Sequence, residues 1–264
     1  MDRVLVTGCS AGIGRATAAT LAERGYDVVA TARRPETLSD LEVSQKLPLD
    51  VDDPSSVQAA VDAAGAIDIL VNNAAWGAIG PIETIPLDEV RAMYETNVFG
   101  PLRMLQAVVP GMRERGRGTV VNVSSVTGMT ATMPLNGLYA STKHALEAIT
   151  ETLHYELRNF GLRVVSVQPA YTATNWAGNE RWLGVGQPPW DELYEMVKAL
   201  DEDGREDAAP VEDVVDVIVE AIEGDDPPLR MPVGEAAKQG MERRRKLDDR
   251  EWEQLIDERR PFTW

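Results

Sequence analysis

A tyrosine and a lysine stand four residues apart in Tyr139-Ala140-Ser141-Thr142-Lys143, a spacing that puts both side chains on one face of a helix. A phenol with a pKa of about 10 is a poor acid or base at neutral pH. A neighbouring ammonium group lowers that pKa because it favours the phenolate. The pair could therefore move a proton to or from a substrate oxygen, although such pairs also occur by chance.

A glycine-rich loop gives a second chemical signal. Residues 7–14 read TGCSAGIG and lie between a β-branched run and a segment of helical composition. Gly8 would permit the turn out of the strand, Gly12 would let the backbone approach a pyrophosphate, and Gly14 would let the helix pack closely on the sheet. The spacing Gly-x3-Gly-x-Gly differs from the commoner Gly-x-Gly-x2-Gly. Although such a loop can be merely a turn, its position favours a dinucleotide site.

The end of the second predicted strand indicates which dinucleotide is preferred. A carboxylate there would accept hydrogen bonds from the adenosine ribose and repel a 2′-phosphate. This chain instead continues with Arg33 and Arg34, whose guanidinium groups could bind a 2′-phosphate. Arginines after a strand are often only solvated surface groups, so that alternative stays open. We predict NADP(H) rather than NAD(H), with Asp50 near the adenine amino group.

Four motifs follow one another in a familiar order: TGCSAGIG from Thr7, NNAA from Asn72, SSVTG from Ser124 and YASTK from Tyr139. With these motifs the chain resembles the short-chain dehydrogenase/reductase family over roughly residues 3–175. The segments VVATARRPETL and PLNGLYASTK are similar to the hydroxysteroid and retinol dehydrogenase branch. The resemblance implies an oxidoreductase that transfers a hydride between nicotinamide and a carbonyl or secondary alcohol.

The resemblance also implies a role for each catalytic candidate. Tyr139 would donate or remove the proton, and Lys143 would bind the nicotinamide ribose and lower the Tyr139 pKa. Ser125 would hold the substrate oxygen beside the phenol. Asn97 would support a water-linked proton path, unless it is an ordinary polar residue in a long helix.

The cofactor contacts implied by the family pattern are distributed along the chain. They are Gly8, Ser10, Ile13 and Gly14 at the pyrophosphate, Arg33 and Arg34 at the 2′-phosphate, Asp50 and Val51 at the adenine, Asn73 and Ala74 at the adenosine ribose, Tyr139 and Lys143 at the nicotinamide ribose, and Pro169, Thr172 and Thr174 near the carboxamide. Ala75 and Ala170 depart from the pattern because glycine is usual at both positions. The interval of fourteen from Ser125 to Tyr139 is one residue longer than is common.

Short apolar runs that alternate with helical patterns must position these residues. We predict strands at residues 4–7, 28–32, 46–51, 67–72, 119–124, 162–168 and 229–233. Helices are predicted at 16–24, from 53 onward, and at 86–115, 139–160 and 211–223. This alternation favours an α/β fold: a single Rossmann-type, doubly wound parallel sheet of about seven strands with helices on both faces.

One domain over residues 1–264 is expected, with an irregular substrate lid at 172–204 and a charged C-terminal extension at 235–264. The lid contains Trp176, Trp182 and Trp190, and Trp76, Met133 and Leu135 could face the same pocket. We therefore expect a bulky, apolar small-molecule carbonyl or alcohol as substrate. The alternative is that the tryptophans only pack the lid onto the body.

Composition restricts the other partners. The net charge of −17 disfavours nucleic acid and anionic membrane surfaces. Cys9 is the single cysteine and His144 and His154 lack ligand spacing, so we predict no disulfide framework and no metal. Cys9 is expected as a small loop residue, with a redox switch as the alternative. Without a signal-like start or an apolar run of about 18 residues, we expect a cytoplasmic protein with no membrane span.

The two long helices at 86–115 and 139–160 resemble those through which family members form dimers or tetramers, so we expect a homodimer or homotetramer. Their apolar residues could equally pack on the sheet. Two other functions remain as alternatives: a catalytically silent NADP(H)-binding regulator or scaffold, and a family enzyme without net redox chemistry.

Overall fold

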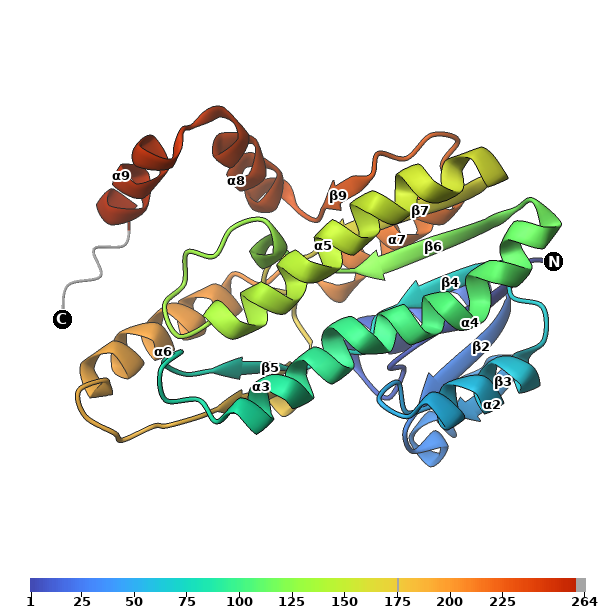
Figure 1. Cartoon of the computed structure of the whole chain (residues 1–264), viewed down its shortest axis with the longest axis horizontal. Coiled ribbons are helices and arrows are strands. Elements are labelled where there is room, and N and C mark those ends of the chain that lie inside the picture. Colours follow the sequence, from blue (N-terminus) through green and yellow to red (C-terminus); the bar gives the residue numbers. More distant parts are fainter. Residues whose placement is uncertain (175, 260–264) are drawn as a thin grey trace.

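A seven-stranded sheet forms the centre of the computed structural model, which describes residues 1–174 and 176–259 (Figure 1). Its strands lie in the order β3-β2-β1-β4-β6-β7-β9, and every neighbouring pair is parallel. Their bounds are β1 Arg3–Val6, β2 Asp27–Ala32, β3 Gln45–Pro48, β4 Ile69–Asn72, β6 Gly118–Val123, β7 Leu162–Gln168 and β9 Arg230–Pro232. The predicted α/β fold with about seven parallel strands is confirmed.

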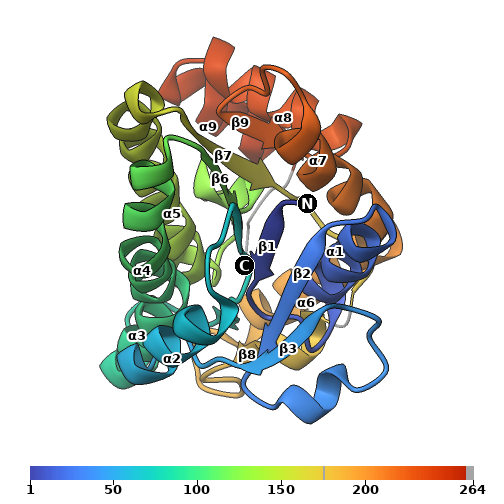
Figure 2. The same ribbon diagram turned by 90° about the vertical axis from the view of Figure 1, so that its right-hand side faces the viewer.

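Helices cover both faces of this sheet, because each buried strand has apolar side chains pointing both ways. In β1, Val4 and Val6 belong to one core and Leu5 to the other. Figure 2 shows α4 and α5 on one side of the sheet and α1 and α7 on the other. One layer consists of α1 Gly12–Glu23 and α7 Val211–Glu223. The other layer consists of α2 Pro54–Ala64, α4 Gly100–Arg115 and α5 Gly137–Leu157.

The long helix predicted over 86–115 is present from Leu87 to Arg115, but its backbone is not α-helical throughout. The chain forms α3 Leu87–Tyr94, a wider π-helical turn Glu95–Phe99, and then α4. In this turn the Gly100 amide bonds back to the Glu95 carbonyl, five residues earlier. Pro101 is the physical reason, because it has no N–H to donate and its ring crowds the carbonyl one turn back.

The lid at 172–204 was expected to be irregular throughout, and this was wrong for residues 191–204. Residues 191–206 form helix α6 Asp191–Glu206, which begins with two acidic residues, favourable at a helix N-terminus. Leu193, Tyr194 and Val197 bury one face of α6. A short strand of the lid, β8 Glu180–Trp182, pairs in parallel with β5 Gly77–Ile79 in a separate two-stranded sheet. The Trp176 side chain, also assigned to the lid, lies outside the described structure.

The charged extension begins with two helices, α8 Glu235–Lys246 and α9 Asp249–Arg259, which follow β9 at the edge of the sheet (Figures 1 and 2). Ala237 and Met241 of α8 are buried. Residues 260–264 of the predicted extension lie outside the described part. Within residues 1–174 and 176–259, no helix combines the length and the hydropathy needed to cross a bilayer.

Candidate active site

The glycine loop between β1 and α1 leaves backbone space that a side chain would fill. Gly8 and Gly12 have φ angles of +74° and +59°. A Cβ on Gly8 would lie 2.9 Å from the Ala74 Cα, and one on Gly14 would lie 2.4 Å from the Asn73 Nδ2. No side chain caps the N-terminus of α1, so its first amides remain available to an anion. The loop therefore fits a dinucleotide pyrophosphate.

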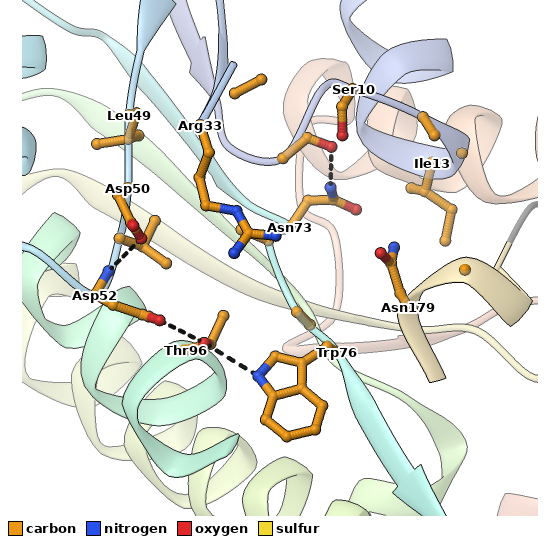
Figure 3. Close-up of a pocket in the computed structure, with 18 of the residues that line it drawn as sticks. Ser10, Ile13, Arg33, Leu49, Asp50, Asp52, Asn73, Trp76, Thr96 and Asn179 are labelled. Atoms are coloured by element: carbon orange, nitrogen blue, oxygen red, sulfur yellow. Dashed lines mark hydrogen bonds between the residues drawn. The ribbon is translucent and has the colours of Figure 1, made fainter. Parts of the chain in front are cut away.

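A cleft extends from this loop along the carboxyl ends of the first strands (Figure 3). It brings together nine of the predicted cofactor residues: Gly8, Ser10, Ile13, Arg33, Asp50, Val51, Asn73, Ala74 and Thr174. Gly14 lies directly beneath the loop, against the Gly8 carbonyl. Pro169 and Thr172 do not line the cleft: Pro169 accepts from the Val126 amide, and Thr172 bridges to Ala209.

The two arginines after β2 differ in position. The Arg33 side chain extends into the cleft, between Asp50 and Asn73 (Figure 3). Arg34 is not among the residues that line it, and its carbonyl instead accepts two hydrogen bonds from Thr37, at 3.1 Å and 2.7 Å. Of these two arginines, Arg33 is therefore the one placed to meet a phosphate in this cleft.

Trp76, Thr96 and Asp52 also line the cleft, although none of them was predicted as a cofactor contact and Trp76 was expected at the substrate pocket. The Trp76 indole donates to the Thr96 hydroxyl at 3.2 Å, and Thr96 donates to the Asp52 carboxylate at 2.9 Å. Burial raises the Asp52 pKa. The neighbouring Asp53 instead caps helix α2, where its side chain accepts from the Ser55 amide. The sequence shows only that some of these residues lie near the ends of strands. Their contacts could not be predicted, because they join segments that are far apart in the sequence.

The three predicted catalytic side chains lie together. The Ser125 hydroxyl is hydrogen-bonded to the Tyr139 phenol. The Lys143 Nζ lies 5.7 Å from the centroid of the Tyr139 ring and donates to the Val123 carbonyl at 2.9 Å. Ser125 is held by the turn that follows β6, where its Oγ accepts from the Thr127 amide at 3.2 Å.

Burial acts on both titratable groups of this cluster. It raises the pKa of the Tyr139 phenol well above its usual range, and the hydrogen bond from Ser125 opposes that effect. Burial also lowers the pKa of Lys143 to about 8, while the charge of Glu147 opposes the change. A positive charge beside the phenol would therefore be needed for acid–base work near neutral pH.

Asn97 lies in the π-helical turn and is almost completely buried. Its Nδ2 donates to the Trp76 carbonyl at 2.7 Å and to the Thr142 hydroxyl at 3.1 Å, while its Oδ1 accepts from the Trp76 amide at 3.0 Å. Thr142 in turn donates to the Tyr139 carbonyl at 2.8 Å. Asn97 thus joins the cofactor cleft to the helix that carries Tyr139 and Lys143.

The lid has a small apolar cluster of its own. Ile79, Leu135, Leu193, Tyr194 and Val197 are buried together, with Met133, Trp182 and Trp190 packed against them. The ring of Trp182 lies 6.2 Å from that of Tyr194, centroid to centroid. Trp182 and Trp190 therefore pack the lid onto the body. Trp76, by contrast, lines the cofactor cleft.

Residues 2–182 match the family model of short chain dehydrogenases. The chain belongs to this family. Among its relatives are the oxidoreductase YusZ of Bacillus subtilis, 33% identical over 89% of each chain, and a 3-ketodihydrosphingosine reductase of Bacteroides thetaiotaomicron, 32% identical over 88% of this chain and 87% of the relative. Human retinol dehydrogenase 8 is 38% identical over 66% of this short-chain dehydrogenase and 60% of its own length.

Solved structures agree with this assignment. A short-chain dehydrogenase from Streptomyces avermitilis has a TM-score of 0.84 and 32% identity, with 96% of each chain covered. One from Burkholderia cenocepacia in complex with NADP has a TM-score of 0.77 and 27% identity over 98% of this dehydrogenase and 96% of that chain. One from Burkholderia phymatum in complex with NAD has a TM-score of 0.80 and 27% identity over 93% of each chain.

Proposed function

We propose that this short-chain dehydrogenase uses NADP(H) to interconvert a carbonyl compound and a secondary alcohol. Two observations carry this proposal. Ser125, Tyr139 and Lys143 lie together, and the glycine loop and Arg33 line the cleft, although none of the three catalytic candidates lines it. Asn97 connects the two parts, because it bonds to Trp76 of the cleft and to Thr142 of α5. A bound nicotinamide would supply the hydride or accept it and, when oxidised, would supply a positive charge near the phenol. All other roles belong to side chains of this chain.

Each catalytic side chain has a defined role in this proposal. Ser125 orients the substrate oxygen beside the Tyr139 hydroxyl, which gives its proton in reduction and takes one in oxidation. The Lys143 ammonium binds the nicotinamide ribose and favours the phenolate of Tyr139. Asn97 supports the proton path by holding the cleft against α5.

The preference for NADP(H) rests on Arg33. The 2′-phosphate is dianionic near neutral pH, and Asp50 and Asp52 in the same cleft would repel it without a cation. Arg33 supplies that cation with a planar fork of donors that suits a phosphate. Solved relatives carry NADP in one case and NAD in another, so the family alone leaves the choice open.

For the substrate we propose a bulky, apolar ketone or alcohol. Two relatives are a 3-ketodihydrosphingosine reductase and a retinol dehydrogenase, which supports an extended apolar compound. The apolar side chains of the lid, Trp182 and Trp190 included, pack in a cluster with Ile79 and Leu135, so the choice rests on these relatives. Higher turnover of small polar carbonyls than of every bulky ketone tested would contradict this choice.

We further propose one catalytic domain over the whole chain, a cytoplasmic location, and assembly into a dimer or tetramer through α4 and α5. These helices lie side by side (Figures 1 and 2). Phe99, Tyr155 and Phe160, at or near their ends, are about half exposed. Apolar side chains exposed in this way favour a helix-pair interface. A monomer mass in light scattering would refute the assembly.

The deciding experiment titrates the protein with NADPH and NADH and follows nicotinamide fluorescence. A panel of ketones, quinones and aldehydes is then tested for consumption of the cofactor. We expect tighter binding of NADPH, and turnover that falls by a factor of about 10² to 10⁴ in Tyr139→Phe with the cofactor affinity retained. Binding of NADPH without turnover of any compound would favour the silent regulator instead.

A further inference from the structure

Glu147 is a buried carboxylate one helical turn after Lys143, only 3% exposed, and the catalytic roles above do not use it. Its Oε1 accepts from the Ser166 hydroxyl at 2.5 Å and from the Gln168 amide at 2.9 Å. Its Oε2 accepts from the Arg230 Nε at 2.8 Å. Three donors thus hold this carboxylate in one position.

These bonds join α5 to the two adjoining strands at the edge of the sheet. Ser166 and Gln168 belong to β7, and Arg230 belongs to β9, which pairs with β7 in register. Arg230 also bonds to Glu151, one further turn along α5, at 2.8 Å. The two carboxylates differ in burial, because the Glu151 side chain is 47% exposed and that of Glu147 only 4%.

Glu147 also contacts the segment that carries Ser125. A Cβ on Gly128 would lie 2.9 Å from the Glu147 Cγ and 3.1 Å from the Lys143 carbonyl oxygen. The turn after Ser125 therefore packs directly on Glu147 and on the backbone of Lys143. A single side chain supports both the serine turn and the lysine turn of the catalytic cluster.

The charged surroundings of Lys143 favour a specific role for Glu147. Its negative charge acts on Lys143, whereas Glu180 of the lid acts on Tyr139. The other charged and titratable groups on elements packed against α5 are engaged elsewhere. Arg163 bonds to carbonyls at the end of α7, and the Tyr94 hydroxyl donates to Ser141. The remaining groups form ion pairs: Glu95 with Arg103, Asp88 with Arg91, and Glu89 with Arg181. On α5 itself, His144 and His154 approach backbone carbonyls, and Arg158 beyond its end stacks on Tyr155.

We propose that Glu147 is a positioning residue of the catalytic cluster: its buried carboxylate, fixed by β7 and β9, keeps the Lys143 ammonium charged and the serine turn in place. The inference rests on the proposed function, in which Lys143 must be charged to act on Tyr139. It also connects the C-terminal strand to the catalytic cluster, because Arg230 of β9 is one of the three donors to this carboxylate.

The test measures the charge of Lys143 without requiring any activity. The chain has five lysines, so the ¹³Cε signals of labelled lysine can be followed by NMR as the pH changes, and Lys143→Arg assigns the signal. In Glu147→Gln we expect the Lys143 pKa to fall by about one unit, the scale of one neighbouring opposite charge. Glu151→Gln is the matched control: it removes the other partner of Arg230 and should leave the Lys143 pKa unchanged.

NADPH binding gives a second readout. If the charged form of Lys143 binds the nicotinamide ribose, a fall of the pKa from about 8 to about 7 weakens binding roughly fivefold at pH 8 and leaves it unchanged at pH 6. Glu151→Gln should bind like the unaltered protein at both pH values. Failure of the unaltered protein to bind NADPH would count against the proposed function, while the lysine titration would still decide the role of Glu147.

Two outcomes would overturn the inference: the same Lys143 pKa in Glu147→Gln as in the unaltered protein, or an equal shift in both glutamine variants. Should Glu147→Gln fail to fold, Arg230→Met provides a test of opposite sign. Removing that competing positive charge leaves Glu147 bonded to Ser166 and Gln168 and should raise the Lys143 pKa. A fall or an unchanged value in Arg230→Met would contradict the role assigned to Glu147.

Discussion

Arg181 of the lid stacks on Trp76 of the cofactor cleft, with the guanidinium carbon 4.4 Å from the centroid of the indole ring. Arg181 also pairs with Glu89 of α3 at 2.8 Å. Since the Trp76 backbone is bonded to Asn97, this stack connects the lid to the residues that join the cleft to α5. The lid therefore touches the nucleotide side of the site as well as the substrate side.

Arg181→Met should loosen this connection. It keeps part of the apolar stem over the ring but removes the charge, a loss of about 0.5 to 1 kcal/mol for a partly exposed cation–π contact. We expect NADPH to dissociate about two to five times faster in stopped-flow displacement. Arg181→Lys, which retains a cation, should show a smaller change. An NADPH dissociation rate equal to that of the unaltered protein would mean that the stack has no influence on the cleft.

Arg33 and Arg34 should differ sharply when replaced by alanine. Arg33→Ala loses a charge-assisted contact with the 2′-phosphate worth about 1.5 to 3 kcal/mol, so the Kd for NADPH should rise about tenfold to a hundredfold. The Kd for NADH, which has no such phosphate, should hardly change. Arg34→Ala is the matched control, because Arg34 does not line the cleft. Fluorescence titration of both cofactors checks this, and equal losses in the two variants would indicate a general charge effect.

Lys143→Met should lose activity yet gain stability at neutral pH. Burial lowers the Lys143 pKa from 10.5 to about 8, so between these values the unfolded chain binds more protons than the folded one. The stability of the unaltered protein must then rise with pH through this window. The variant should be more stable by up to about 3 kcal/mol at pH 7, and the gap should close towards pH 10. Urea unfolding of both proteins at several pH values measures this difference in the free energy of unfolding.

Cys9 should be unreactive in the folded protein. Its Sγ is fully buried and donates to the Val6 carbonyl at 3.2 Å, and burial raises its pKa to about 12. Because the thiolate is the reactive form, a thiol reagent at pH 8 should label the native chain far more slowly than the chain in guanidinium chloride. Rapid native labelling would revive the redox-switch alternative. At present the position supports a packing role.

Several predicted site residues lie where local rules, together with the family motifs, would place them. Tyr139 and Lys143 are fixed by helical spacing, and Ser125, Asp50 and Asn73 follow strands whose parallel carboxyl ends meet at one edge. Such a pattern depends only on neighbours in the sequence. Arg34 shows the limit of this reasoning, because two adjacent arginines look equivalent until the direction of each side chain is known.

The features that were missed depend on contacts between distant segments. Strands β5 and β8 are three residues long and are defined only by each other, across about a hundred residues. Helix α6 has a strongly acidic exposed face and an internal glycine, so its buried face becomes evident only against Ile79 and Leu135. The π-helical turn forms because the helix continues on both sides of Pro101. From the sequence alone, Pro101 could equally have ended the helix.

The apolar side chains of the lid form a cluster separate from the two cores that flank the sheet. Opening the lid would therefore expose this small cluster and leave the packing of the seven-stranded sheet intact. In hydrogen-exchange terms, α6 should behave as its own cooperative unit, with an opening free energy well below that of global unfolding. Ligand entry and release can thus occur many times within the lifetime of one folded molecule.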